Sequence, residues 1–348
     1  MDRQTLFLNG DDKGAVRCGL CHHACLIPNG CFGSCGVRGN KNGRGFIPFY
    51  GHITAFALDP VEKKPLYHFR PGTMILSAGF AGCNFRCPFC QNWGISQASG
   101  KDIPGRQMPP GDIVREALKQ ESSAIAYTYS EPLVHIEYLL DCMNLARKHG
   151  IANVIITNGC VNTDAAGEIL SLTDAANIDL KCFSPGTYEK NLCGNLETVL
   201  AFIRLAVKKG VHVETTTLVV PDLNDSLDEL DGIANFLVSL NSELKTQNPP
   251  APEVPWHLSA YRPEYRWNAP PTDPEFLIRL KKRAAGKLRY VYTGNISIGD
   301  NNTVCPGCGT VLVRRFGYRV KIEGLSNLVE GENVFRCIRC GEKTDIVG

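Results

Sequence analysis

The chain has 348 residues, 43% of them hydrophobic, and its 37 Lys and Arg residues nearly balance 35 Asp and Glu residues. This length exceeds one small domain and fits a large domain with appendages, while a net charge of +2 predicts no strong attraction to nucleic acid or to a membrane surface. The first residues, MDRQTLFLNGDDKG, lack the apolar core of a signal peptide. No apolar run reaches the roughly 18 residues of a spanning helix, so we expect a cytoplasmic protein with no membrane partner.

Sixteen cysteines stand in the chain, and most of them gather in three clusters. In a long chain with no export signal, cysteines spaced by two or three residues favour metal sites over disulfides. The other cysteines are scattered and fit buried structural thiols that bind nothing: Cys142, Cys160, Cys182 and Cys193.

Residues 1–70 do not alternate between strand-like and helix-like segments, and we predict that they form an N-terminal cysteine-rich extension. His22, His23 and Cys31 compete there for a metal that four other cysteines can ligate. Zinc and a second iron–sulfur cluster are both open as the metal. A zinc site would be structural, whereas a cluster could pass electrons or bind substrate. The four cysteines are Cys18, Cys21, Cys25 and Cys35.

Residues 71–300 alternate strand-like and helix-like segments. One helical pattern has Pro132 in its first turn and stops at Gly150, and another opens with Ser226 and Glu229 at the spacing of a capping box. Such alternation predicts an α/β fold, a parallel sheet closed into a full or partial (β/α) barrel, with an open doubly wound sheet as the alternative. The strand-like segments are 74–80, 123–129, 152–158, 175–181, 211–220, 255–261 and 288–295.

The loop AGCNFRCPFCQNWGISQ follows the first of these segments and carries Cys83, Cys87 and Cys90. Chemistry in a barrel sits at the C-terminal ends of the strands, where this loop lies. Iron–sulfur clusters are usually held by four thiolates, so three thiolates leave one iron open to a small molecule. The alternative is zinc with a distant fourth ligand, which the spacing disfavours because zinc sites prefer paired CxxC knuckles.

The CxxxCxxC spacing, with Phe89 before its last cysteine, resembles the signature of radical S-adenosylmethionine (SAM) enzymes. Further motifs follow in order, among them CGLCHHAC, DPVEKKPLYHFRPG, YTYSEP, TTLVVPDLNDS, YVYTGN and CPGCG. Together they resemble the radical enzymes of the AmmeMemoRadiSam system, which are themselves similar to pyruvate formate-lyase activating enzymes. The resemblance implies a (β/α) barrel and a [4Fe–4S] cluster on Cys83, Cys87 and Cys90. It also implies that the open iron chelates SAM, whose reductive cleavage gives a 5′-deoxyadenosyl radical that abstracts hydrogen.

Polar residues end or follow the other predicted strands, and the resemblance implies that the cofactor binds at these strand ends. Glu62, Lys63 and Lys64, in the motif before the first strand, are predicted to cap the barrel mouth. The residues expected to bind the cofactor are Ser130 and Glu131 toward the methionine amino group, Thr157 and Asn158 toward the sugar, Asp179 and Lys181 toward the ribose and the carboxylate, and Thr217, His257 and Arg262.

Residues 301–348 are predicted to form a C-terminal zinc-ribbon-like module. Two CxxC knuckles close a four-thiolate site, typical of structural zinc, with a rubredoxin-like iron or auxiliary cluster as the alternative. The strand-like stretch TVLVRRFGYRVKIEG is basic and could contact nucleic acid or an acidic partner, although a solvated face is favoured. The ligands are Cys305, Cys308, Cys337 and Cys340.

The leading functional hypothesis is an enzyme that makes a 5′-deoxyadenosyl radical and modifies a substrate. An activase that places a radical on a glycine of a partner protein is the alternative within the same class. A zinc-dependent binding module, with every cysteine structural, is the alternative of another class. The resemblance implies SAM, an electron donor such as flavodoxin or ferredoxin, and AMMECR-type and Memo-type proteins as partners.

Overall fold

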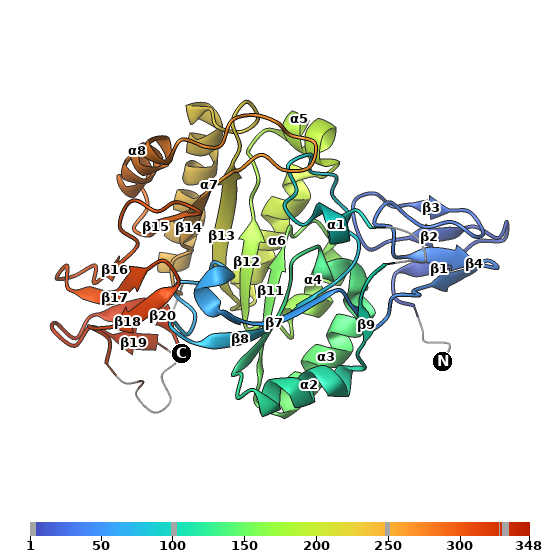
Figure 1. Cartoon of the computed structure of the whole chain (residues 1–348), viewed down its shortest axis with the longest axis horizontal. Helices are drawn as coiled ribbons and strands as arrows, with labels where there is room; N and C mark the ends of the chain where they lie inside the picture. Colours follow the sequence, from blue (N-terminus) through green and yellow to red (C-terminus); the bar gives the residue numbers. More distant parts are fainter. Residues whose placement is uncertain (1–4, 99–102, 248–250, 327, 329–333) are drawn as a thin grey trace.

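The computed structural model describes residues 5–98, 103–247, 251–326, 328 and 334–348. Figure 1 shows a central sheet flanked by helices, with small N-terminal sheets on one side and a C-terminal β module on the other. Residues 1–4 of the predicted N-terminal extension lie outside the described residues.

The central sheet contains all seven predicted parallel strands, and each strand pairs with the next one along the chain. Since this order never reverses, the sheet is singly wound, and the doubly wound alternative is wrong. The sheet stays open in the described residues, with β7 and β15 at its edges, so the barrel is partial. The strands are β8 (Met74–Gly79), β10 (Ala124–Thr128), β11 (Ala152–Thr157), β12 (Ala175–Asp179), β13 (His212–Val219), β14 (Trp256–Ala260) and β15 (Val291–Gly294).

In the described residues, the central sheet has an eighth strand. This strand comes from the segment predicted to precede the barrel. Strand β7 (Ala55–Pro60) pairs antiparallel with β8, from Ala55 opposite Gly79 to Pro60 opposite Met74. The short helix η1 (Val61–Lys63) follows it. The domain boundary at residue 70, between the N-terminal extension and the barrel, stays a prediction. Strand β7 lies before this boundary in the sequence, yet it is part of the barrel sheet.

Helices connect the parallel strands and cover the outer side of the sheet (Figure 1). Ser226 caps α7 by accepting a hydrogen bond from the Glu229 amide at 3.3 Å, whereas the Glu229 carboxylate accepts from the Phe183 amide instead of completing the box. No helix in the described ranges is both long enough and apolar enough to cross a membrane. The helices are α1 (Trp93–Ser96), α2 (Pro110–Lys119), η2 (Pro132–His135), α3 (Ile136–Lys148), α4 (Thr163–Leu170), α5 (Pro185–Thr187), η3 (Tyr188–Leu192), α6 (Leu196–Lys208), α7 (Leu227–Lys245) and α8 (Pro274–Ala285).

The N-terminal segment is fastened to the barrel by a buried ion pair. Arg38 is 1% exposed, and its guanidinium donates to both carboxylate oxygens of Glu137 on α3, at 2.7 and 2.8 Å. Removing one partner would leave the other charge buried and unpaired, which is strongly destabilising. The strands of this segment are β1 (Leu8–Gly10), β2 (Val16–Cys18), β3 (Leu26–Ile27), β4 (Gly39–Lys41), β5 (Arg44–Phe46) and β6 (His52–Ile53), which pairs with β9 (Arg106–Gln107).

The C-terminal module packs against the segment that enters the barrel. The Arg315 guanidinium lies 4.3 Å from the ring centre of Tyr67 and donates to the Tyr67 carbonyl at 2.6 Å. The His68 ring contacts the Tyr292 hydroxyl at 2.7 Å and the Asp345 carbonyl at 3.3 Å. The module consists of β16 (Thr303–Val304), β17 (Val311–Phe316), β18 (Arg319–Ile322), β19 (Val334–Arg336) and β20 (Lys343–Val347).

The buried ring of His68 predicts an acid-sensitive junction between barrel and module. Burial lowers the pKa of His68 to about 4, whereas the unfolded chain should titrate near 6.5. The stabilisation is therefore complete above pH 6.5 and is lost as pH falls toward 4, by ~2 kcal/mol at pH 5. Urea unfolding at pH 7.5 and pH 5 should show a larger loss for the wild type than for His68→Gln. Equal losses would contradict this account.

Candidate active site

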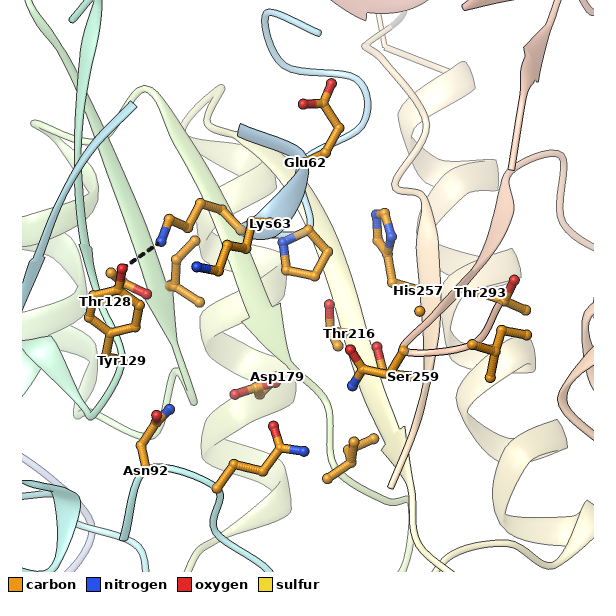
Figure 2. Close-up of a pocket in the computed structure, with 18 of the residues that line it drawn as sticks. Glu62, Lys63, Asn92, Thr128, Tyr129, Asp179, Thr216, His257, Ser259 and Thr293 are labelled. Carbon is orange, nitrogen blue, oxygen red and sulfur yellow. Dashed lines mark hydrogen bonds between the residues drawn. The ribbon is translucent and has the colours of Figure 1, made fainter. Parts of the chain in front are cut away.

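A cavity of about 890 Å³ lies at the C-terminal ends of the parallel strands (Figure 2). Its walls come from the cysteine loop after β8, from the ends of the neighbouring strands and from the C-terminal module. The volume falls within the range typical of ligand sites. The predicted cap residues Glu62, Lys63 and Lys64 also line it.

The cysteine loop brings Cys83, Cys87 and Cys90 to the wall of this cavity. The Phe85 amide donates to the Cys83 sulfur at 3.3 Å, and the Ser96 hydroxyl lies 3.2 Å from the Cys90 sulfur. Hydrogen bonds to sulfur are one of the protein's means of tuning a cluster. The loop therefore presents the three thiols together, on the face where a barrel does its chemistry.

Asp179 and Lys181 face each other in the cavity. Their Oδ2 and Nζ atoms are 2.7 Å apart, with side chains 30% and 16% exposed. Burial alone would lower the pKa of Lys181, but the Asp179 carboxylate raises it overall, so the ammonium stays charged at neutral pH. Ser130 and Asn158 also line the cavity; the Ser130 hydroxyl donates to the Phe80 carbonyl at 2.7 Å.

Register explains which threonine of β13 reaches the cavity. Asp179 pairs with Thr216, and Thr216 pairs with His257, so these residues point to the same side of the parallel sheet. Thr217 faces the opposite side, where it donates to the Leu180 carbonyl at 2.7 Å. Thr217 is therefore not part of the lining, and its neighbour Thr216 is.

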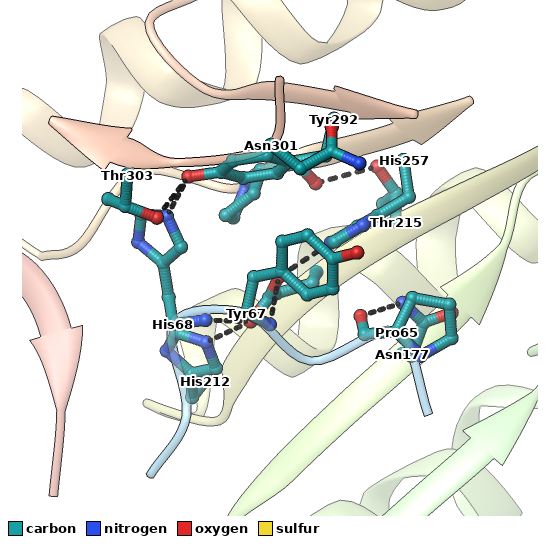
Figure 3. A network of polar contacts seen from close by, with 12 residues as sticks. Pro65, Tyr67, His68, Asn177, His212, Thr215, His257, Tyr292, Asn301 and Thr303 are labelled. Carbon is teal, nitrogen blue, oxygen red and sulfur yellow. Dashed lines mark hydrogen bonds and ion pairs between the residues drawn. The ribbon is translucent and has the colours of Figure 1, made fainter. Parts of the chain in front are cut away.

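His257 belongs to a network of polar contacts that also includes His68, His212 and Tyr292 (Figure 3). The His257 Nε2 atom lies 2.7 Å from Glu214, which also accepts from the amides of Tyr67 and His68 and contacts His212 at 3.1 Å. Although burial opposes ionisation, the two histidines hold the pKa of Glu214 well below its usual range. His257 lines the cavity, and its contact with the cofactor stays a prediction.

Arg262 is exposed and does not line the cavity. It follows β14 by two residues, so the chain has already left the strand end and turned toward solvent. A cofactor contact for Arg262 has no support from this placement.

Glu131 lies at the cavity but is only 1% exposed. Its carboxylate accepts hydrogen bonds from the Thr157 hydroxyl at 2.6 Å, the Asn158 amide at 2.8 Å and the Leu133 amide at 3.1 Å. Burial outweighs these bonds and raises the pKa of Glu131 to about 7. Thr157 itself does not line the cavity. Glu131 thus organises the ends of β10 and β11, and its predicted contact with the cofactor remains a prediction.

A known protein resembles the chain over nearly its whole length. Residues 79–237 match the Radical SAM superfamily. Over 349 aligned residues, 99% of each chain, it is 40% identical to an uncharacterized protein of Methanocaldococcus jannaschii. The chain belongs to the radical SAM superfamily. It is also 24% identical to the pyruvate formate-lyase-activating enzyme of Clostridium pasteurianum, over 48% of this chain and 71% of that enzyme.

The fold agrees with this assignment. A radical SAM methyltransferase from Sphaerobacter thermophilus superposes with a TM-score of 0.51 at 15% identity, covering 66% of this chain and 68% of that one. By the match of residues 79–237, the protein is a radical SAM enzyme, and a [4Fe–4S] cluster and SAM are the cofactors typical of its superfamily.

Part of the radical SAM enzyme's cavity was not anticipated from the sequence. The end of β15 (Thr293 and Gly294), the loop that follows it up to Gly299, and the β17–β18 turn from Phe316 to Tyr318 all line it, together with Arg315. The strand-end rule that selected Asp179 would have selected Thr293 as well. The turn of the C-terminal module carries no such signal, because it reaches the barrel only through tertiary packing.

The C-terminal cysteines of the radical SAM enzyme form a compact ligand set. Their sulfur atoms all lie within 4.8 Å of one another. Among the described residues, no other group of three or more cysteine, histidine or acidic side chains brings its ligand atoms this close together. A tetrahedral zinc site with bonds of about 2.3 Å would place its sulfurs about 3.8 Å apart, so the set fits a single ion with a closed shell. The residues are Cys305, Cys308, Cys337 and Cys340.

Replacing Cys308 and Cys337 together with alanine should remove one metal ion per chain and unfold the C-terminal module. The module's buried cluster is small, consisting of two of these cysteines and three aliphatic residues, so metal binding should supply much of its folding free energy. Elemental analysis measures the loss, with Cys31→Ala as the exposed control. An unchanged metal content in the double variant would contradict the site.

Replacing Glu131 should destabilise the radical SAM enzyme. In Glu131, one carboxylate oxygen accepts from the Thr157 hydroxyl and the other from the Asn158 amide. Glu131→Gln replaces one of these oxygens with an NH2 group, so the glutamine side chain cannot accept both hydrogen bonds. Leaving a buried group unsatisfied costs about 1–3 kcal/mol, so thermal unfolding should shift down by several degrees. Glu168→Gln, on the exposed face of α4, is the matched control. A melting temperature equal to that of the control would show that the hydrogen bonds of Glu131 do not support the fold.

In the N-terminal extension, the histidines that were expected to compete for metal are engaged elsewhere. His22 lies 3.1 Å from both the Cys160 sulfur and the Cys193 carbonyl, and His23 lies 2.8 Å from the Asn84 carbonyl. Both rings therefore face the barrel. Cys31 is exposed.

Proposed function

We propose that this radical SAM enzyme binds a [4Fe–4S] cluster through Cys83, Cys87 and Cys90 and abstracts hydrogen from a small substrate in the same cavity. One observation carries the proposal: three thiols and an Asp179–Lys181 ion pair line a single cavity of about 890 Å³. The donor set fits a cubane, because the lining formed by the described residues contains no fourth cysteine and so leaves one iron open. When bound, the cluster supplies the electron that splits SAM into methionine and a 5′-deoxyadenosyl radical.

The chain's own side chains would fix the position of SAM. Lys181, kept cationic by Asp179, suits the SAM carboxylate, and Asp179 suits a ribose hydroxyl. The Asn158 side-chain amide donates to the Asn84 side chain at 2.8 Å and to the Cys83 sulfur at 3.8 Å, so Asn158 would stand beside the sugar without turning its amide to it. Glu131 acts through Thr157 and Asn158 as a positioning residue.

The part of the cavity beside the C-terminal module would receive the substrate. Glu62, His257 and Arg315 line it, and the β17–β18 turn of the C-terminal module contributes Phe316 and Tyr318. Ligand sites span about 300–1,000 Å³, so the volume suits SAM together with one small molecule. His257, anchored by Glu214, is the side chain best placed to orient that molecule.

We also propose the family within the radical SAM superfamily to which the enzyme belongs. The ordered motifs support an enzyme of the AmmeMemoRadiSam type, with AMMECR-type and Memo-type partners and a flavodoxin or ferredoxin as electron donor. The division at residues 70 and 300 belongs to the same proposal, amended by the pairing of β7 with β8.

A glycyl-radical activase is the second candidate, favoured by the similarity to the pyruvate formate-lyase-activating enzyme. Fractionating an extract of the source cells by mass separates the two functions. The proposal expects the low-mass fraction to stimulate 5′-deoxyadenosine formation by the cluster-loaded enzyme. Stimulation confined to the protein fraction, with a glycyl radical in the electron paramagnetic resonance (EPR) spectrum, would favour the activase.

A further inference from the structure

Four cysteines of the N-terminal extension converge around one point. Cys18, Cys21 and Cys35 belong to one buried cluster, and Cys25 packs against it. The amide of Ser34, the residue before Cys35, donates to the Cys25 sulfur at 3.4 Å. The Cys18 amide donates to the Cys25 carbonyl at 2.9 Å. Cys18, Cys21 and Cys35 are buried and Cys25 is partly buried. With both neighbouring histidines turned to the barrel, these four thiols are the candidate ligands of a metal in this extension.

The spacing of these sulfurs differs from that of the C-terminal site. In the C-terminal site, all four sulfur atoms lie within 4.8 Å of one another. Among the described residues, no three sulfur atoms of the N-terminal set lie that close together. The sulfur atoms of Cys83, Cys87 and Cys90 do not lie that close together either. A single ion draws its sulfurs within about 3.8 Å, whereas a cubane spreads its ligands over separate irons. In this respect the N-terminal set resembles the barrel loop.

Backbone amides surround these thiols. The Ser34 amide donates to the Cys25 sulfur at 3.4 Å. The Ser34 hydroxyl lies 3.4 Å from the same sulfur. Concave sets of backbone N–H groups are a recurring feature of iron–sulfur sites, because they stabilise negative charge on sulfur.

The two cysteine loops touch. Gly82, with φ of +80°, has no room for a side chain, because a Cβ there would lie 2.5 Å from the Cys35 carbonyl oxygen. His23 contacts the Asn84 carbonyl, and Arg86 donates to the Ser34 carbonyl. The N-terminal thiols therefore lie directly behind the loop that carries Cys83.

We propose that Cys18, Cys21, Cys25 and Cys35 bind a second [4Fe–4S] cluster that relays single electrons to the cluster in the barrel. Four thiolates leave no iron open, which suits electron transfer rather than SAM binding. The relay rests on the proposed function; the metal site does not. A low-potential flavodoxin or ferredoxin would give up one electron to the N-terminal cluster. That electron would pass to the barrel cluster and enter the C5′–S bond of SAM, leaving the N-terminal cluster oxidised again.

Iron, sulfide and zinc contents of anaerobically reconstituted variants test the metal site. The variant lacking Cys83, Cys87 and Cys90 should keep about four irons and four sulfides per chain and show the EPR signal of a reduced cluster. The Cys18→Ala/Cys21→Ala variant should contain about four irons and four sulfides per chain fewer than the wild type. Cys31→Ala should contain as much iron and sulfide as the wild type. A second zinc ion per chain, beyond the one expected in the C-terminal module, in place of the iron of the barrel triple variant would overturn the proposal. That variant decides the question alone if the N-terminal double variant does not fold.

Two electron donors test the relay. With dithionite, which reaches either cluster, Cys18→Ala/Cys21→Ala should still form 5′-deoxyadenosine. With reduced flavodoxin its rate should fall at least about tenfold relative to wild type. An undiminished rate with flavodoxin would overturn the relay, and so would equal losses with both donors. Failure of the wild type with both donors would instead refute the proposed function.

Discussion

Replacing Cys83, Cys87 and Cys90 together with alanine abolishes the formation of 5′-deoxyadenosine. The three thiols line the same cavity as Asp179 and Lys181, so without them no cluster stands beside SAM to deliver an electron. The metal ion of the C-terminal module should remain, because its four ligands belong to a separate packed cluster. Chromatography of anaerobic reactions with SAM and dithionite measures the product.

The matched control for this triple variant is Cys31→Ala, which removes an exposed thiol of the N-terminal extension. It should retain wild-type activity. If the triple variant still forms 5′-deoxyadenosine above the level of an enzyme-free reaction, the assignment of these cysteines is wrong.

Replacing Lys181 with methionine weakens SAM binding by about ten- to a hundredfold, since a charge-assisted hydrogen bond contributes roughly 1.5–3 kcal/mol. The melting temperature should change little, because the remaining Asp179 side chain is 30% exposed and can be solvated. Calorimetric titration of cluster-loaded protein measures the affinity.

Lys190→Met, which alters an exposed lysine in η3, is the control for charge. It should bind SAM like the wild type. Wild-type affinity in Lys181→Met would show that the Asp179–Lys181 pair serves the substrate or the fold instead.

The parallel strands could be predicted because each is a short apolar run between helical patterns. Strand β7 could not, because Ala55–Pro60 follows no such alternation and is placed by pairing with β8, a contact set by tertiary structure. Half of the predicted capping box formed: Ser226 caps α7, while Glu229 is drawn to the Phe183 amide by the packing of another loop.

In the site, the rule that polar residues at strand ends face the cavity found Asn158, Asp179 and His257. It failed at Thr217, because one step along a strand reverses the side to which a residue points. It failed at Arg262, which lies beyond the strand. The contribution of Phe316 and Tyr318 could not be inferred at all, since no local pattern indicates that the C-terminal module reaches the barrel.

The most direct test of the central claim uses the wild-type protein. Anaerobically reconstituted enzyme is reduced with dithionite and supplied with SAM, and 5′-deoxyadenosine and methionine are quantified together. The account predicts that both products form in equal amounts and only when the protein carries its cluster. A cluster-loaded, reduced protein that binds SAM but releases neither product would contradict it.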